Sequence, residues 1–274
     1  MAAQQIQSAV VDIESSGVVV TRDAARLDEV RLADTQAVIV TPGGRSDWEF
    51  GLAAAVERGA FRIPRKVLSI RHAEEAAHVL EAGLSSDGID FETRVALVDD
   101  IADLAARLER LSRRAGIMLR IFTEAPTELC GFHLDTVGPR LPPFGLLKIY
   151  NGEGTRYVLA ADVTAMSAFY AYLGRREGLS AKWRAACVAG QAMEAERWRG
   201  EMCALDRSLP FLRQGSVVRQ VPAGAIVAFR HLDVREHWSA HPVGRAWLHC
   251  SPMSGVPRLV VNLTPLGGGA ARPD

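Results

Sequence analysis

The chain of 274 residues is 48% hydrophobic and 23% charged, and its 32 lysines and arginines balance its 32 aspartates and glutamates. The formal net charge of zero argues against the basic surface that nucleic-acid binding requires, and no apolar run reaches the roughly 20 residues that span a bilayer. The N-terminus, MAAQQIQSAVVDIESSG, lacks the pattern of a secretory signal and no CxxC pair occurs, so we expect a cytoplasmic protein with reduced cysteines.

The first part of the chain, residues 1–115, alternates between strand and helix patterns. Short β-branched runs predict strands at GVVVT (17–21), QAVIVT (36–41) and KVLSI (66–70). Periodic apolar residues predict helices over 47–60, with Asp47 as the N-cap, over 71–83 and over 95–111. We therefore expect residues 1–115 to form an N-terminal α/β region that packs on the rest of the protein.

Strand patterns dominate from residue 116 to residue 264. Strands are predicted at GIMLRIFTE (116–124), GFHLDTV (131–137), GSVVRQV (215–221), GAIVAFR (224–230), GRAWLHC (244–250) and PRLVVNL (257–263), with a hairpin around NGEG over 145–160. Two helical stretches, 164–178 and 180–202, form a predicted insertion over 164–205. The pattern indicates an α+β protein with a sandwich or barrel core over 116–264 and a disordered tail over 265–274.

The run LCGFHLDTV (129–137) places a histidine and an aspartate two residues apart. In a strand, His133 and Asp135 would point to the same face, where burial costs stability unless something compensates the charge. A divalent metal would do so. Two histidines and one carboxylate on one side of a metal leave three open positions, as in non-haem iron(II) oxygenases.

His249 has the best context for the second histidine, because it ends the predicted strand GRAWLHC. The other candidates have poorer contexts: His72 and His78 lie on a predicted helix, and His231, His237 and His241 lie in a polar stretch that is more typical of a loop. The structural alternative for all three chosen residues is a hydrogen-bonded group in the core.

Arg258 opens the strand RLVVNL and shares a face with Val260 and Asn262. A guanidinium can bind a carboxylate through two parallel hydrogen bonds. Arg258 therefore suits the far end of a dicarboxylate whose keto-acid end is bound by the metal. Lys148 and Tyr150 share one face of the predicted hairpin and are further candidates for co-substrate binding, although strand packing explains them almost equally well.

The ordered set FHLDT, GAIVAF, LHCSP and PRLVV resembles the iron(II)/2-oxoglutarate-dependent oxygenase superfamily, and LLKIYNGEGT with HCSP and RLVVNL resembles an uncharacterised bacterial family of that architecture. The resemblance implies a double-stranded β-helix (jelly-roll or cupin-like) core. It also implies that His133, Asp135 and His249 bind Fe(II), while Arg258 binds 2-oxoglutarate.

The function implied by this resemblance is oxidation of a small organic substrate, an amino acid or natural-product intermediate, by hydroxylation, desaturation or cyclisation with O2 as the oxidant. Two alternatives are a non-catalytic metal-binding or sensing protein and a cupin-like metalloenzyme that does not use 2-oxoglutarate. We expect no nucleic-acid or membrane partner. The insertion over 164–205 is predicted to form a lid over the site or, alternatively, a homodimer interface.

Overall fold

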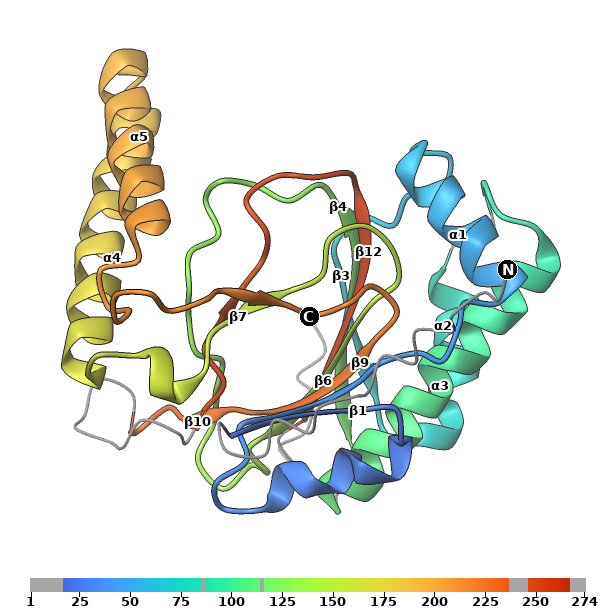
Figure 1. Ribbon diagram of the computed structural model, residues 1–274. Helices are drawn as coiled ribbons and strands as arrows, with labels where there is room; N and C mark the ends of the chain where they lie inside the picture. Colours follow the sequence, from blue (N-terminus) through green and yellow to red (C-terminus); the bar gives the residue numbers. More distant parts are fainter. Residues whose placement is uncertain (1–16, 85–86, 114–115, 237–245, 267–274) are drawn as a thin grey trace, which may run out of the picture.

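A seven-stranded sheet forms the centre of the molecule in a computed structural model that describes residues 17–84, 87–113, 116–236 and 246–266. Its strands follow the order β1-β2-β9-β6-β12-β4-β3 (Figure 1). They are β1 (Val18–Thr21), β2 (Ala37–Val40), β3 (Lys66–Ile70), β4 (Ile117–Glu124), β6 (Phe144–Ile149), β9 (Ile226–Arg230) and β12 (Arg258–Pro265). Residues on both sides of position 115 thus contribute strands to the same sheet.

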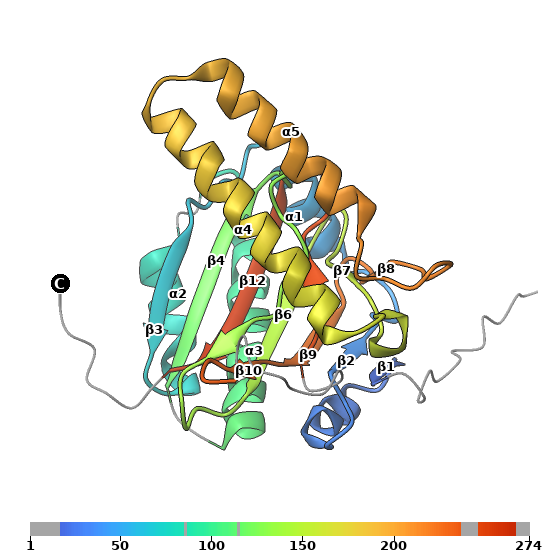
Figure 2. The same ribbon diagram turned by 90° about the vertical axis from the view of Figure 1, so that its left-hand side faces the viewer.

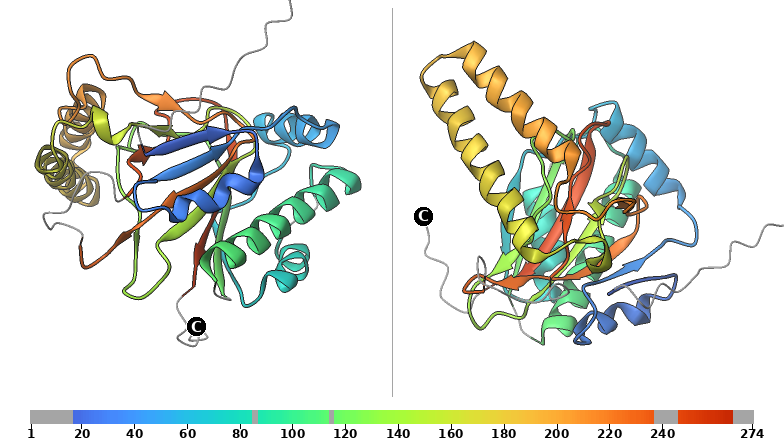
Figure 3. Two further views of the ribbon diagram at one scale, coloured as in Figure 1. Left: turned by 60° about the horizontal axis from the view of Figure 1, so that its bottom comes forward. Right: turned by 60° about the vertical axis from the view of Figure 1, so that its left-hand side comes forward.

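Helices cover one face of this central sheet (Figures 1 and 3). They are α1 (Asp47–Glu57), α2 (Ala76–Gly83) and α3 (Phe91–Ser112), together with the short 3-10 helices η2 (Ala24–Arg31) and η3 (Ala73–Glu75), which share the same buried core. A further 3-10 helix, η4 (Ala160–Asp162), precedes α4. The apolar stripe of α3, including Leu97, Ile101 and Leu108, is buried against Leu119 and Val261 of the sheet. Each such side chain contributes roughly 1.5–3 kcal/mol by leaving water.

Two smaller sheets lie on the opposite side. One has the order β11-β7-β8, and the other pairs β10 with β5 in parallel. Their bounds are β5 (Thr136–Val137), β7 (Arg156–Tyr157), β8 (Arg219–Gln220), β10 (Leu232–Asp233) and β11 (His249–Cys250). Tyr157 and Trp247 share a buried apolar cluster with Leu147 and Val260 of the central sheet, so the three-stranded sheet packs on that face.

Two long helices, α4 (Met166–Val188) and α5 (Ala192–Ser208), form a hairpin that extends beyond the sheets (Figure 2). Its base packs through Phe169, Tyr172 and Met202 against Phe132. None of the helices in the described ranges is long and apolar enough to cross a membrane.

The structure corrects four local predictions. The N-cap of α1 is Ser46, in a capping box with Glu49, and not Asp47. The segments 145–150 and 155–160 do not form a hairpin, because β6 pairs with β9 and β12 while β7 pairs with β8 and β11. The chain has a single bridge at His133 and becomes a strand only at Thr136, so 131–137 is not one strand. The break between the two long helices comes after Val188 and not near residue 179.

Candidate functional site

Three of the predicted residues come together between the central sheet and the three-stranded sheet. One ligand atom from each of His133, Asp135 and His249 can be chosen so that all lie within 4.8 Å of one another. The Nε2 atom of His133 lies 3.8 Å from Asp135 Oδ1, and that of His249 lies 3.8 Å from Asp135 Oδ2. The sequence pattern therefore identified three side chains that the fold does bring into one group.

A backbone bridge holds the two histidines side by side. The His133 amide donates to the His249 carbonyl at 2.9 Å, and the His249 amide donates to the His133 carbonyl at 3.2 Å. Asp135 is held by a further contact, since its carbonyl accepts from the Leu232 amide at 2.8 Å. His133 and Asp135 face the same way, as predicted, although a single bridge followed by the short strand β5 positions them.

The hydrogen bonds of the two imidazoles fix which nitrogen atoms face the carboxylate. His133 Nδ1 lies 3.0 Å from the Gly131 carbonyl, and His249 Nδ1 lies 3.1 Å from the Trp247 carbonyl. A carbonyl only accepts, so the neutral form of either imidazole would carry its proton on Nδ1 and direct the lone pair of Nε2 at Asp135. The lone pairs of the two Nε2 atoms would then face the carboxylate oxygens of Asp135 with no proton between them. A bound cation stabilises such an arrangement.

The protonation states agree with this arrangement. Burial lowers the pKa of His249 to about 4, and the charge of His133 acts in the same direction. Burial acts to raise the pKa of Asp135, but the charges of His249 and the groups around it outweigh burial and lower that pKa overall. At neutral pH the site therefore presents a neutral imidazole at His249 and an ionised carboxylate.

The residues of the group differ in their exposure to solvent. The His249 side chain is 7% exposed, whereas that of His133 is 41% exposed. His133 also lines a groove along α4, together with Leu173, Arg176 and Ser180. Helix α4 thus borders the exposed side of His133.

Arg258 lines the same cavity of about 220 Å³ as His133, Asp135 and His249. Its side chain is buried, and its Nη1 donates to the Glu153 carbonyl at 2.8 Å. The loop that holds it passes through Gly152 at a φ of 68°, where an added Cβ would lie 3.0 Å from Arg258 Cγ. Gly152 of NGEG thus allows the loop to pack closely on this arginine.

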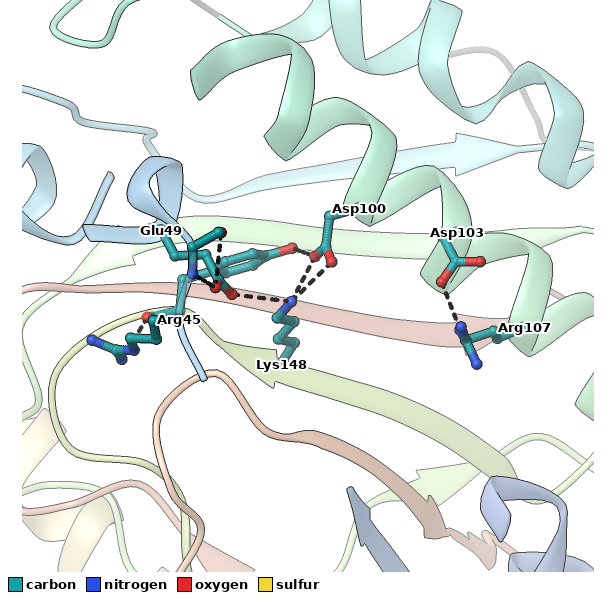
Figure 4. Close-up of polar contacts among 8 residues, drawn as sticks. Arg45, Glu49, Asp100, Asp103, Arg107 and Lys148 are labelled. Carbon is teal, nitrogen blue, oxygen red and sulfur yellow. Dashed lines mark hydrogen bonds and ion pairs between the residues drawn. The ribbon is translucent and has the colours of Figure 1, made fainter. Parts of the chain in front are cut away.

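Lys148 and Tyr150 lie on the other face of the central sheet and not in the cavity. The Lys148 ammonium donates to both carboxylate oxygens of Asp100 at 2.9 Å and lies 3.9 Å from Glu49 (Figure 4). The Tyr150 hydroxyl donates to Asp100 at 2.5 Å. Both predicted side chains are thus engaged with the helices, because strand alternation directs Leu147 and Ile149 into the cavity instead.

A buried polar network connects the helical hairpin to the segment before His133. The Tyr172 hydroxyl accepts from the Phe132 amide at 3.0 Å and donates to Asp206 at 2.7 Å. Arg176 donates to Asp206 at 2.9 Å and also bonds the Leu129 carbonyl. A Cβ at Gly131 would collide with this network, 2.4 Å from the Tyr172 hydroxyl. The hairpin therefore fixes the backbone on which His133 stands.

Two further polar residues lie near the group: the sequence indicated Arg120 as a minor candidate and did not select His231. Arg120 of β4 lines the cavity beside Asp135, and its only signal in the sequence is a charge within the apolar run IMLRIF. His231 is 2% exposed and lies close to Gly145 and Phe229. It follows the alternation of Val227 and Phe229, a signal obscured by its polar neighbours. His237 and His241 lie outside the described residues.

Comparisons place these features among known proteins. A family model described as "Protein of unknown function (DUF1826)" matches residues 22–202. No curated protein matches the chain.

Among solved structures, the chain is similar to the dioxygenase for auxin oxidation of rice, with 12% sequence identity, coverage of 89% of this chain and 77% of that chain, and a TM-score of 0.42. A prolyl-4-hydroxylase from Pseudomonas putida shows 12% identity, coverage of 89% and 98%, and a TM-score of 0.39. The Kdo hydroxylase KdoO, a non-heme Fe(II) alphaketoglutarate dependent dioxygenase, shows 10% identity, coverage of 91% and 89%, and a TM-score of 0.42. These likenesses are distant, so a function has to be argued from the residues of the cavity.

Proposed function

This chain belongs to the DUF1826 family, and we propose that it is an iron(II)- and 2-oxoglutarate-dependent oxygenase that oxidises a small organic substrate. One observation carries the proposal: two imidazole nitrogens and a carboxylate face one another in the cavity that Arg258 also lines. Neutral imidazoles and an ionised carboxylate are the ligands of the two-histidine, one-carboxylate iron sites.

In this proposal His133, Asp135 and His249 bind the iron. Their Nδ1–H groups donate to the Gly131 and Trp247 carbonyls, which hold the rings in the orientation that a metal ligand needs. Three coordination positions remain open for small molecules. When bound, iron with 2-oxoglutarate and O2 would supply the oxidising power, with succinate and CO2 as co-products.

Arg258 binds the far carboxylate of 2-oxoglutarate in this proposal. Its Nε has no protein partner among the described residues, so the guanidinium keeps donor capacity directed toward a ligand. A buried cation is retained only where something compensates it, and a carboxylate does so through charge-assisted hydrogen bonds. Neither a sensor nor a cupin-like enzyme needs this arginine, which is why we favour the oxygenase over both alternatives.

The central sheet and the three-stranded sheet that packs on it would be the two halves of a double-stranded β-helix core. We propose that residues 116–264 form this core, with the α4–α5 hairpin as its insertion and the first 115 residues as an N-terminal region that extends the central sheet. The cytoplasmic location and the homodimer remain predictions.

Titration of 2-oxoglutarate into the Fe(II)-loaded protein, combined with detection of succinate under air, tests the proposal. Wild type is expected to bind one Fe(II) and to form succinate, whereas His249→Ala should do neither. His72→Ala is the matched control, because its imidazole is 55% exposed and lies beside Glu109 of α3, outside the lining of the cavity. A wild-type protein that binds iron without binding 2-oxoglutarate would favour a sensor or a cupin-like enzyme instead.

Arg258→Gln separates the co-substrate from the metal. We expect unchanged iron binding and an affinity for 2-oxoglutarate that is lower by roughly ten- to a hundredfold, since a charge-assisted bond contributes about 1.5–3 kcal/mol. Arg197→Gln, which removes a guanidinium that is 61% exposed on α5, should leave both affinities unchanged. Equal affinities for 2-oxoglutarate in wild type and Arg258→Gln would remove Arg258 from the proposed site.

A further inference from the structure

A second cavity, of about 310 Å³, adjoins the first at Asp135. Arg120 and Asp135 line both cavities, whereas the described lining of the second includes His231 and Thr264 but not Arg258. The rest of its wall is mainly apolar, with side chains from Met118, Leu134, Val137, Leu141 and Pro265. Polar groups and apolar side chains thus share the wall, and a volume near 300 Å³ is sufficient for a small molecule.

Arg120 is a cation that the described protein leaves unpaired. It makes no hydrogen bond and no ion pair with the residues that the structure describes, whereas Arg65 pairs with Glu124 at 2.6 Å and Arg258 donates to Glu153. Arg120 lies opposite Asn262 in the register of β4 and β12, and Arg258 lies opposite Glu124. The two arginines are thus separated by about 14 Å along the strands, at roughly 3.4 Å per residue.

Two buried groups of the second cavity also have unused hydrogen-bonding capacity. Both ring nitrogens of His231 and the Oγ1 of Thr264 lack a protein partner among the described residues. His231 is 2% exposed and Thr264 is 6% exposed. Buried polar atoms nearly always bond to protein, water or ligand, and a neutral imidazole offers one donor and one acceptor.

We propose that this cavity binds the substrate that the enzyme oxidises, and that this substrate is a small organic monoanion. Its carboxylate lies on Arg120, its apolar body lies against Met118 and Leu141, and a hydroxyl or amide group bonds to His231. A single anionic group fits better than a dianion, because Arg120 is the one arginine or lysine among the described residues that line this cavity. The role as substrate rests on the proposed oxygenase function, whereas the binding of the anion does not.

Binding of matched acids and amides to the full-length, metal-free protein tests the proposal without turnover. The probes are phenylacetate, 4-hydroxyphenylacetate and octanoate, each compared with its primary amide by isothermal titration and ligand-observed NMR. We expect at least one acid to bind saturably and its amide to bind at least tenfold more weakly. Equal binding of acids and amides, or no saturable binding of any acid, overturns the proposal.

Substitutions of the lining residues test where the carboxylate of the acid binds. Arg120→Gln should weaken the acid by roughly ten- to a hundredfold, Arg120→Lys should retain part of the affinity, and Arg258→Gln should change it by less than about threefold. His231→Leu should remove any advantage of 4-hydroxyphenylacetate over phenylacetate. If Arg258→Gln weakens the acids as much as Arg120→Gln, or if Arg120→Gln weakens 2-oxoglutarate as much as Arg258→Gln, Arg120 belongs to the co-substrate site and the proposal is wrong.

The two proposals fail in different ways. Arg120-dependent binding of acids without succinate formation from 2-oxoglutarate would overturn the oxygenase function and leave the anion site standing. Succinate formation without Arg120-dependent binding of any acid would overturn the anion site alone. Thermal unfolding of each variant, measured beside wild type, shows whether a variant that loses affinity is still folded. If Arg120→Gln does not fold, Arg120→Lys provides a second test.

Discussion

The two faces of the central sheet differ in how their polar side chains are paired. On the face that α3 covers, Lys148 and Tyr150 both bond to Asp100, so each buried donor has an acceptor. On the cavity face, Arg120 makes no hydrogen bond or ion pair with the described residues, and the side-chain oxygens of Asn262 and Thr264 have no protein partner among them. Polar residues on adjacent strands of one sheet therefore have opposite roles.

This difference separates stability from binding. A buried donor with its acceptor in place contributes to the folded state, and removing either one leaves the other uncompensated. A buried donor that the protein leaves without a partner contributes little to stability, but it is available to a ligand. Substitutions on the helix-covered face should therefore change the free energy of unfolding, while those on the cavity face should change affinities.

Asp135→Ala is expected to have the largest effect on the cavity face. It removes the only carboxylate of the three-residue group. We expect Fe(II) affinity to fall by more than about 100-fold, which exceeds the loss on mutating residues that only orient a metal ligand. Inductively coupled plasma analysis of the loaded protein measures it. Retention of stoichiometric iron in this variant would exclude Asp135 as a ligand.

Asp100→Ala is the corresponding change on the helix-covered face. It leaves the Lys148 ammonium, which is only 5% exposed, without its closest acceptor, and breaking such a pair costs about 3–5 kcal/mol. Urea unfolding measures the loss, and iron binding should be unchanged. Asp103→Ala provides the control on the same helix (Figure 4), because its pair with Arg107 is 53% exposed at the carboxylate and should contribute only about 0.3–0.5 kcal/mol.

His231 predicts a pH dependence of the metal-free protein. Burial lowers the pKa of His231 from 6.5 to about 4, so between these values the unfolded chain binds more protons than the folded one. The free energy of unfolding is then fully present above about pH 6.5 and falls as the pH drops toward 4, by on the order of 3 kcal/mol for this residue. Urea unfolding between pH 7 and pH 4.5 measures the slope.

His231→Asn should flatten that slope without abolishing it, since His249 is shifted in the same direction. Identical slopes for wild type and His231→Asn would mean that His231 titrates equally in both states and is not buried as a neutral imidazole.

Arg176→Gln should have the smallest effect on the metal. It removes the bonds to Asp206 and to the Leu129 carbonyl, which position the segment before His133. We expect iron affinity to fall by roughly tenfold, the lower end of the range for residues that orient a ligand. Arg175→Gln is the matched control, because this neighbour on α4 is exposed. Equal affinities in the two variants would show that the hairpin does not support the site.

Strand and helix periodicity predicted most elements of the central sheet and its helices. The alternation in IMLRIF and RLVVNL corresponds to β4 and β12, and the apolar stripe over 95–111 corresponds to α3. The order of His133, Asp135 and His249 was sufficient to select the group that the fold assembles. Local spacing carries this information because it decides which face each side chain takes.

The pairing of strands with one another could not be predicted from the sequence in the same way. The short loop NGEG predicts a hairpin, yet β6 and β7 enter different sheets because each finds its partners far along the chain. The same limit affects Lys148 and Tyr150. The sequence shows that they share one face of a strand, but it does not show whether that face meets the helices or the cavity. Only the position of α3, which brings Asp100 to them, decides that question.

The bridge between His133 and His249 has a consequence for how the protein is made. These residues exchange backbone hydrogen bonds although both long helices of the hairpin lie between them in the sequence. During synthesis on the ribosome, His133 and Asp135 therefore emerge long before the imidazole that completes their group, and contacts between such distant residues form late in folding. Small zinc domains fold around their metal. In this protein the metal would instead enter a nearly finished chain, so the supply of iron would limit how much protein is active and not how much of it folds.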